Sequence, residues 1–353
     1  MKKIYLSGFF LVVSLFVKGQ RGNLIPFEDE KYYHWSEDGH VHRHFGYKDV
    51  KGNVVIFPKY DDARPFFKGI SIINVGRTWN EDNNLNGKWG FIDNTGKEIV
   101  PPRYDGINDF YIEELASQMQ SRVPDCYDFI AVSLNKKWGY IDRTGKEIIP
   151  TKYEDVRCWS EGLAAVKLND KWGYINKTGK EIISIKYDNV GFWVDGTSAV
   201  KLNNKWGFID KNGRQVVRIK YNYIGSFNPE LRFSYETPIL VGLKNKYGYI
   251  NKSGKKVTPV KYDSAQPFSQ ELAAMKKSGK WGYINSNGKE VIPFEYEHAD
   301  PFFNGRARVK KLIKQIQTEK WARRINKEVY GCDPCYITVY GYIDKTGKFF
   351  PDH

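Results

Sequence analysis

The stretch Lys171-Trp-Gly-Tyr-Ile-Asn-Lys-Thr-Gly-Lys-Glu-Ile-Ile183 decides the fold, because seven related stretches recur along the chain. The most closely spaced copies start 34 residues apart, and this spacing sets the length of the repeating unit. Some copies lie farther apart because insertions fall near residues 76–86, 108–127, 227–238 and 311–338. The eight leading aromatic residues are Phe45, Trp89, Trp138, Trp172, Trp206, Tyr247, Trp281 and Tyr340.

Each copy predicts a strand followed by a tight turn. Gly follows the leading aromatic residue, and a second aromatic residue follows Gly, as in Trp172-Gly173-Tyr174. In a strand, both rings then share one face, and the other face admits a close backbone neighbour. Next come Asp or Asn and, three residues later, Gly, which is typical of a hairpin turn held by the Asx side chain. Asn replaces Asp in three copies, and a turn tolerates this exchange better than a calcium site does.

The rest of the unit completes an antiparallel meander. A β-branched segment such as 147–149 leads to a Tyr-acid pair such as Tyr153-Glu154, and small apolar residues such as 162–166 precede the next copy. We expect the Tyr-acid segment to form a fourth, outer strand. The prediction is therefore an all-β array of eight meanders, propeller-like with small residues at its crowded centre. An open β-solenoid is the alternative.

The run Lys137-Trp-Gly-Tyr-Ile-Asp-Arg-Thr-Gly-Lys-Glu-Ile-Ile-Pro-Thr-Lys-Tyr-Glu154 resembles the WG repeat family. The resemblance covers roughly residues 45–351 and extends to Glu161-Gly162-Leu163. It implies a β-repeat scaffold of a kind widespread in bacteria, often exported, and generally without an assigned activity. The leading aromatic residues are then structural, and we expect the rings of Trp89, Trp138, Trp172, Trp206 and Trp281 to be buried between neighbouring sheets.

The N-terminus has the pattern of a signal peptide. Lys2 and Lys3 precede an uncharged apolar run over residues 4–17, which is short for a membrane span and suits a signal peptide. We therefore predict a signal peptide over 1–19, a lead-in segment over 20–44 and the repeat array over 45–353. The chain carries 55 Lys and Arg against 41 Asp and Glu, a net charge of +14. The expected product is basic, exported to the periplasm or secreted, and not an integral membrane protein after cleavage.

The insertions are where partner choice is expected to lie, since loops of a repeat array often form its binding face. Residues 108–127 and 311–338 both show apolar residues at helical spacing, so we predict short helices there. The second would be a basic amphipathic helix in which Lys314, Arg323 and Arg324 contact an acidic partner or an anionic envelope surface. The alternative is a capping helix whose charges are simply solvated.

Two smaller clusters could carry chemistry. Cys332 and Cys335 form a C-x-x-C, which predicts a local disulfide or, alternatively, a free or redox-active pair. His40, His42 and His44 alternate, so in a strand they would share a face suited to zinc, copper or nickel. The simpler interpretation is an exposed strand in which these histidines are incidental.

The sequence contains no nucleophile elbow, H-E-x-x-H, P-loop or dinucleotide fingerprint. We therefore expect an exported, non-catalytic scaffold without a cofactor that binds a protein or an anionic envelope component. Nucleic acid is not an expected partner, because an exported protein rarely meets it. The alternative hypothesis is an exported metal-dependent protein or enzyme that uses His40, His42 and His44.

Overall fold

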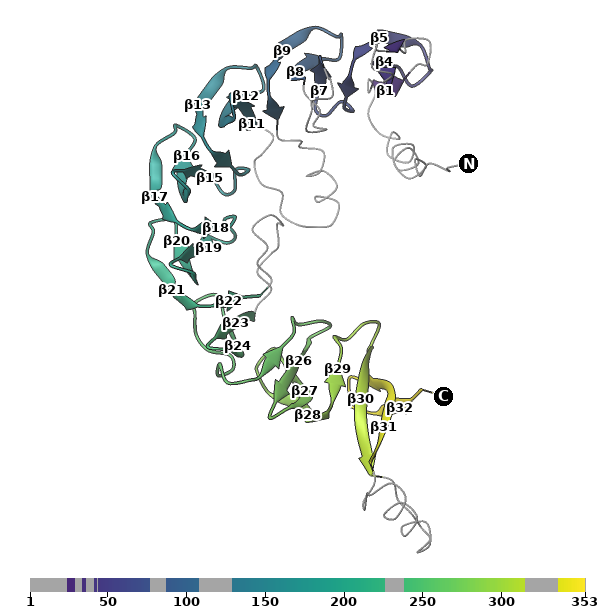
Figure 1. Cartoon of the computed structure of the whole chain (residues 1–353), viewed down its shortest axis with the longest axis vertical. Helices are drawn as coiled ribbons and strands as arrows, with labels where there is room; N and C mark the ends of the chain where they lie inside the picture. Colours follow the sequence, from purple (N-terminus) through teal and green to yellow (C-terminus); the bar gives the residue numbers. More distant parts are fainter. Residues whose placement is uncertain are drawn as a thin grey trace, which may run out of the picture. The chain divides into compact units, whose positions relative to one another are not determined.

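The computed structural model describes residues 24–28, 34–35, 41–42, 44–76, 87–107, 129–225, 238–314 and 336–352. Strands and turns account for all the regular structure in these residues, so the all-β prediction is confirmed (Figure 1). Within the described ranges no helix is long and apolar enough to cross a membrane. Two compact units divide the described chain: unit 1 runs to Trp159 and includes Lys177–Gly179, and unit 2 comprises Ser160–Asn176 and everything from Lys180 onward.

Unit 1 contains the sheets β1-β4-β5, β6-β7-β8-β9 and β10-β11-β12-β13, together with the two-stranded ribbon β2-β3. Its strands are β1 (Ile25–Glu28), β2 (His34–Trp35), β3 (Val41–His42), β4 (Phe45–Lys48), β5 (Val54–Tyr60), β6 (Asp62–Ala63), β7 (Ile70–Val75), β8 (Lys88–Asp93), β9 (Glu98–Tyr104), β10 (Gly106–Ile107), β11 (Phe129–Leu134), β12 (Lys137–Asp142), β13 (Glu147–Tyr153) and β14 (Asp155–Val156).

Unit 2 contains the sheets β15-β16-β17, β18-β19-β20-β21, β22-β23-β24, β25-β26-β27-β28 and β29-β30-β31-β32. Its strands are β15 (Leu163–Leu168), β16 (Lys171–Asn176), β17 (Glu181–Tyr187), β18 (Asn189–Val190), β19 (Thr197–Leu202), β20 (Lys205–Asp210), β21 (Gln215–Tyr221), β22 (Tyr223–Ile224), β23 (Ile239–Leu243), β24 (Lys246–Ile250), β25 (Ser264–Ala265), β26 (Leu272–Lys277), β27 (Lys280–Asn285), β28 (Glu290–Tyr296), β29 (His298–Ala299), β30 (Arg306–Lys314), β31 (Tyr336–Asp344) and β32 (Phe349–Pro351). All these sheets are open.

The prediction that the Tyr-acid segment forms an outer fourth strand is wrong. Tyr187 is the last residue of β17 and pairs with Trp172, so it still belongs to the third of the three long strands of its own sheet, here called the third strand. The chain then crosses over, and the short strand β18 pairs with β19 of the next sheet. Two-residue strands therefore open the sheets after the first, whose opening strand β1 has four residues, and link successive repeats. The sequence pattern does not reveal these short strands.

The Gly of each aromatic-Gly-aromatic step allows a backbone crossing. The third strand bulges where it passes this Gly, as the register shift between Trp172 and Tyr174 shows. A Cβ atom on Gly173 would lie 2.6 Å from the carbonyl oxygen of Ile183, closer than any real contact allows. The predicted close backbone approach opposite the two rings is therefore present.

The core lies mainly between successive sheets. In unit 2, Tyr174 packs with Val190, Trp193 and Val200 of the following repeat. The second aromatic residue is the better buried of the two: Tyr140, Tyr174 and Tyr283 are at most 1% exposed. Among the predicted rings, Trp172 and Trp281 are buried, but Trp89, Trp138 and Trp206 are only half-buried.

The predicted helix over 311–338 is wrong at both of its ends. Residues 311–314 extend β30 and residues 336–338 begin β31, and the two strands pair from Arg306 with Asp344 to Lys314 with Tyr336. The intervening residues 315–335 lie outside the described residues, as do the predicted signal peptide over 1–19 and the predicted helix over 108–127. The insertions near 76–86 and 227–238 lie almost wholly outside them too.

Candidate functional site

The Asx side chains hold the hairpin turns. Oδ1 of Asp142 accepts hydrogen bonds from the Thr144 backbone N–H at 2.9 Å, the Thr144 hydroxyl at 2.6 Å and the Lys146 N–H at 3.0 Å. These bonds, led by that of the Thr144 hydroxyl, hold the pKa of the Asp142 carboxyl below its usual range. Asn251 makes the same contacts with Ser253 and Lys255. The turn interpretation is therefore confirmed.

A lysine–carboxylate pair recurs at a spacing of 17 residues. Nζ of Lys171 lies 2.7 Å from Oδ1 of Asp188, and Lys246 pairs with Asp263 at the same distance. The ammonium group lowers the pKa of each aspartate mainly through this hydrogen bond. Two further pairs, Lys88 with Asp105 and Lys280 with Glu297, follow the same spacing.

His44 occupies the lysine position of this pair in the first repeat. Its Nδ1 lies 3.5 Å from Oδ1 of Asp61, and the two residues have the same spacing along the chain as the lysine pairs. His42 lies on β3, where its backbone is the partner of His34, and His40 lies outside the described residues. The described part of the chain contains no group of three metal-binding side chains.

Where the second aromatic residue is a buried Tyr, its hydroxyl joins the repeat to the next. The Tyr174 hydroxyl donates to the Gly191 carbonyl oxygen at 2.6 Å and lies 2.5 Å from the Ser198 hydroxyl, while its ring packs on Trp193 at 5.0 Å between centroids. Tyr283 repeats this arrangement with Asp300 and Phe302. Burial raises the pKa of Tyr283 well above its ordinary value.

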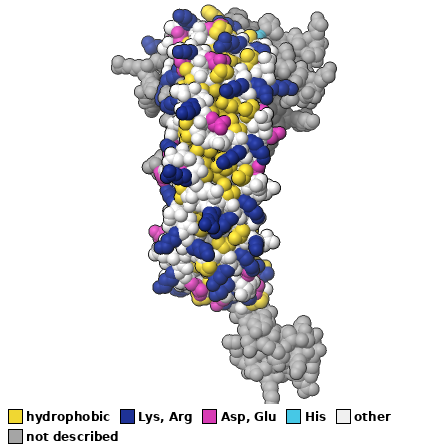
Figure 2. Space-filling model, turned by 90° about the vertical axis from the view of Figure 1, so that its left-hand side faces the viewer, with side chains coloured by type: hydrophobic (Ala, Val, Ile, Leu, Met, Phe, Trp, Pro, Cys, Tyr) yellow, Lys and Arg dark blue, Asp and Glu magenta, His cyan; other side chains and the backbone are white. Residues whose placement is uncertain are grey.

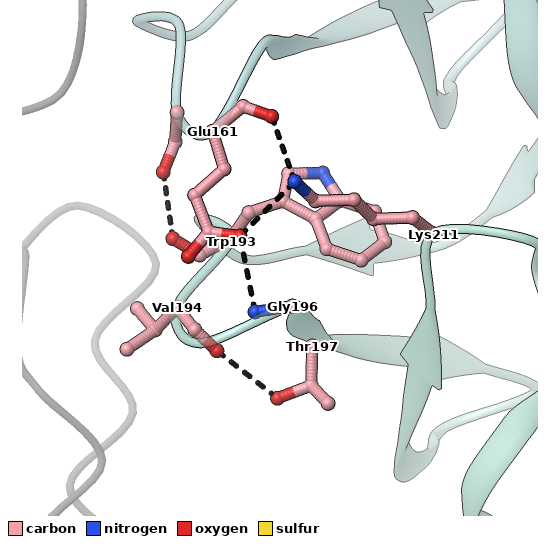
Figure 3. A network of polar contacts seen from close by, with 7 residues as sticks. Glu161, Trp193, Val194, Gly196, Thr197 and Lys211 are labelled. Carbon is pink, nitrogen blue, oxygen red and sulfur yellow. Dashed lines mark hydrogen bonds and ion pairs between the residues drawn. The ribbon is translucent and has the colours of Figure 1, made fainter.

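A second polar network joins the bends of successive repeats (Figure 3). The Glu161 carboxylate accepts from the Gly196 N–H at 3.0 Å, and Lys211 Nζ lies 3.2 Å from the same carboxylate and 2.9 Å from the Glu161 carbonyl oxygen. Gly305 and Gln270 repeat the first contact at 2.8 Å. The recurrence indicates a structural role, so Glu161 is not a candidate acid or base.

Exposed cations accompany the third strands. Lys186 lies over the ring of Tyr187 at 5.4 Å, and Lys220 over Tyr221 at 5.1 Å. On the face that Figure 2 shows, Lys and Arg side chains flank a run of hydrophobic side chains. The sequence reasoning missed these cations, although a basic residue directly before the repeat Tyr was a readable signal. The equivalent residues in unit 1 are Lys59, Arg103 and Lys152.

The predicted partner-binding residues are not brought together within the described residues. Lys314 is the last residue of β30, and its backbone pairs with Tyr336. Arg323, Arg324, Cys332 and Cys335 lie outside the described residues.

The WG containing repeat model matches the chain seven times and covers well over half of it. The matched residues are 45–79, 89–117, 138–172, 172–206, 206–230, 247–281 and 281–312. The chain belongs to the WG repeat family. The eighth predicted copy, at Tyr340, is not among the matched WG repeats.

Other comparisons add little to the WG repeat assignment. The curated proteins contain no match. Similar solved structures include a eukaryotic initiation factor, with 10% identity, a TM-score of 0.38 and coverage of 92% of this chain and 87% of that one. Hsv2p of Kluyveromyces lactis has 10% identity, a TM-score of 0.31 and coverage of 70% and 91%. A Bacteroides caccae protein of unknown function has 15% identity, a TM-score of 0.22 and coverage of 64% and 93%. These likenesses are too distant to bear on function.

Proposed function

We propose that this WG repeat protein is an exported, non-catalytic scaffold that binds a protein or an anionic envelope component. The observation that carries the proposal is that recurring polar side chains are engaged in structural contacts within and between the repeats. Asp142 holds a turn, Lys171 pairs with Asp188, and Tyr174 bonds the following repeat. The exposed recurring side chains include cations such as Lys186, which would attract an acidic partner, and the described residues show no evident reacting group.

The direct test is photo-crosslinking of the full chain in the cell envelope. Benzoylphenylalanine is placed at Phe303, whose side chain is 77% exposed, or in place of Lys220 on the third strand β21. A scaffold should give one discrete adduct that disappears without irradiation. Turnover of an envelope substrate by the purified protein, with no specific adduct from either position, would contradict the proposal.

Export rests on the N-terminal segment, where Lys2 and Lys3 precede the apolar run over 4–17. We propose cleavage after Gly19. N-terminal sequencing of protein from the periplasm or the medium should then begin at Gln20. Protein that retains Met1 and stays in the cytoplasm would rule out export but not partner binding.

Partner selection is assigned in this proposal to the insertion between β30 and β31, because the repeats themselves are nearly interchangeable. Reversing charge at Lys314, Arg323 and Arg324 should weaken partner capture and reduce its salt sensitivity, while thermal unfolding stays unchanged. If the insertion is a cap instead, shortening it should destabilise the last repeat and leave partner capture intact.

The alternative of a metal-dependent protein or enzyme needs His40, His42 and His44 to act together. The contact between His44 and Asp61 weighs against it, because a lysine forms the equivalent pair in other repeats. Metal analysis of the purified protein separates the two proposals. One metal ion per chain that is lost in the His40→Ala/His42→Ala variant would favour the metal-dependent protein.

A further inference from the structure

The last described sheet exposes two rings whose equivalents are buried in the preceding repeat. Tyr342 is 41% exposed, whereas Tyr283, at the same position one repeat earlier, is fully buried. Tyr340 is 48% exposed, and its equivalent Trp281 is 9% exposed. Tyr283 is buried because the last sheet packs on it through Ala307, and no equivalent layer within the described residues covers Tyr342.

Cations replace the apolar residues on this open face. Leu272 and Ala274 of β26 lie on the same face as Tyr283 and are buried against the last repeat. The equivalent residues of β30 are Arg306 and Arg308, and Arg308 is the backbone partner of Tyr342. A further repeat packing here would bury both guanidinium groups, so the face is not built to accept one.

The cations and rings of this face form a single surface. Arg306 lies 5.4 Å from the Phe350 ring centroid, and Lys310 lies 5.8 Å from that of Tyr340. The Arg308 side chain is 57% exposed, and its nearest described carboxylate, on Asp352, lies 3.8 Å away. The face is therefore positively charged as well as aromatic.

Charge alone would make this face a solubility cap of the kind that terminates repeat arrays. A cap of that kind does not require two half-exposed tyrosines, whereas on a binding surface such rings can contact a partner. Tyr and Arg are the side chains enriched where protein interfaces concentrate their energy. The flat Arg group also binds carboxylates through two parallel hydrogen bonds.

We propose that the outer face of β30 and β31, formed by Arg306, Arg308, Lys310, Tyr340 and Tyr342, is a docking surface for an acidic segment of a protein partner. The inference rests on the scaffold function and names the binding surface and the chemistry of the partner. It adds a surface next to the insertion between the same two strands.

A second copy of the chain is a poorer occupant. Contact between two such faces would place Arg306 and Arg308 against like charges. Contact with the first sheet of a second copy is no more favourable, because that sheet has Lys48 at the position that the buried Ile343 occupies in the last sheet. A lipid surface is also less suitable, because the exposed rings of this face are tyrosines and its principal contacts are guanidinium groups.

The test measures binding of a fluorescent oligoglutamate peptide to the full-length mature chain. Arg306→Glu/Arg308→Glu should weaken binding about tenfold or more and flatten its salt dependence, since two charge contacts are reversed. The matched control is Lys97→Glu/Lys146→Glu, which makes the same change in net charge at exposed lysines of the hairpin turns. This control should bind within about threefold of the parent chain. Equal weakening in both variants, or none in the first, would overturn the proposal.

Two further measurements identify the occupant. Vesicles containing phosphatidylglycerol and soluble dextran sulfate are compared with the peptide on the same variants. If either binds through Arg306 and Arg308 while the peptide does not bind, the proposal of an acidic protein partner fails. In the envelope crosslinking experiment, equal partner capture by the parent chain and the Arg306→Glu/Arg308→Glu variant would contradict the proposed docking surface but not the proposed scaffold function. If neither chain captures a partner while a substrate is turned over, the scaffold function itself fails.

Discussion

Tyr283 and Tyr342 stand at the same position in two consecutive copies, yet the first is fully buried and the second is 41% exposed. Their own sheets are alike, since each ring follows the Gly of a strand paired on both sides. What differs is the next layer, which supplies Phe302 and the Asp300 carbonyl oxygen to Tyr283. A WG repeat therefore forms its strands alone but buries its core only through a neighbour.

The hairpin turns show the opposite behaviour. Asp344 in the last sheet accepts from the Thr346 N–H at 2.9 Å and the Lys348 N–H at 3.1 Å, as Asp142 does from its own turn. The pKa of Asp344 is lowered mainly by the Thr346 hydroxyl, again as in Asp142. The turn is thus independent of what packs on the sheet, and the ring is not.

The largest expected effect separates the two tyrosines directly. Tyr283→Ala should lower the free energy of unfolding by about 3–5 kcal/mol, because it removes a buried aromatic side chain. Tyr342→Ala should lower it by less than about 1 kcal/mol, since its ring keeps much of its contact with water. Urea unfolding of both variants provides the measurement. Similar losses from the two would mean that the last sheet is covered after all.

The next effect concerns the Gly between the two rings. Gly282→Ala should cost about 1–3 kcal/mol, because the new methyl group would lie 2.7 Å from the carbonyl oxygen of Ile292 on the seven-residue strand β28. Gly341→Ala meets the carbonyl oxygen of Phe350, but β32 has only three residues and can move aside. We expect less than half the loss there. A larger loss at Gly341 would show that β32 is held as firmly as β28.

A smaller effect comes from the hydroxyl group alone. Tyr283→Phe should cost about 1 kcal/mol, because the bond to the Asp300 carbonyl oxygen is lost, whereas Tyr342→Phe should be close to neutral. The Tyr283→Phe substitution should also change how the stability depends on alkaline pH. Burial raises the pKa of Tyr283, so the unfolded chain ionises first and stability falls as pH rises above about 10. Unfolding midpoints between pH 8 and pH 11, compared with those of the parent chain, should fall less steeply for Tyr283→Phe.

Sequence periodicity predicted the features that a repeat forms alone. The turn at Asp142, the Gly173 crossing and the all-β class follow from residue types at fixed spacing. The short strand β18 could not be predicted, because two residues carry no alternation and their partner β19 lies in the next sheet. The contrast between the fully buried Tyr140 and the half-buried Trp138 also depends on the neighbouring repeat, which supplies Trp159 and the Arg157 carbonyl oxygen to Tyr140.

The error at 311–338 has a readable cause. Residues 306–310 alternate Arg-Ala-Arg-Val-Lys, which is a strand pattern with Ala307 and Val309 on the buried face. The helical spacing of Leu312, Ile313 and Ile316 favoured a helix instead, and the preceding alternation was overlooked. Had the strand been recognised, Arg306 and Arg308 would have been placed on the opposite face from the sequence alone. The regular pairing of Lys171 with Asp188, and hence the role of His44, could likewise have been found by counting along the chain.

The smallest expected effect concerns the hairpin turns, which are alike at Asp142 and in the last sheet at Asp344. Asp142→Asn and Asp344→Asn should shift the unfolding midpoint only slightly at pH 7, because Asn251 holds an equivalent turn. Both native carboxyls have a pKa below the unfolded value of about 4, so their contribution is complete above that pH and is lost as pH falls through the folded pKa. Urea midpoints at pH 7 and pH 3 should therefore differ less in each Asn variant than in the parent chain. Because the turn contacts are local, the two variants should respond alike; a response confined to Asp142→Asn would mean that the turn, like the ring, depends on the neighbouring repeat.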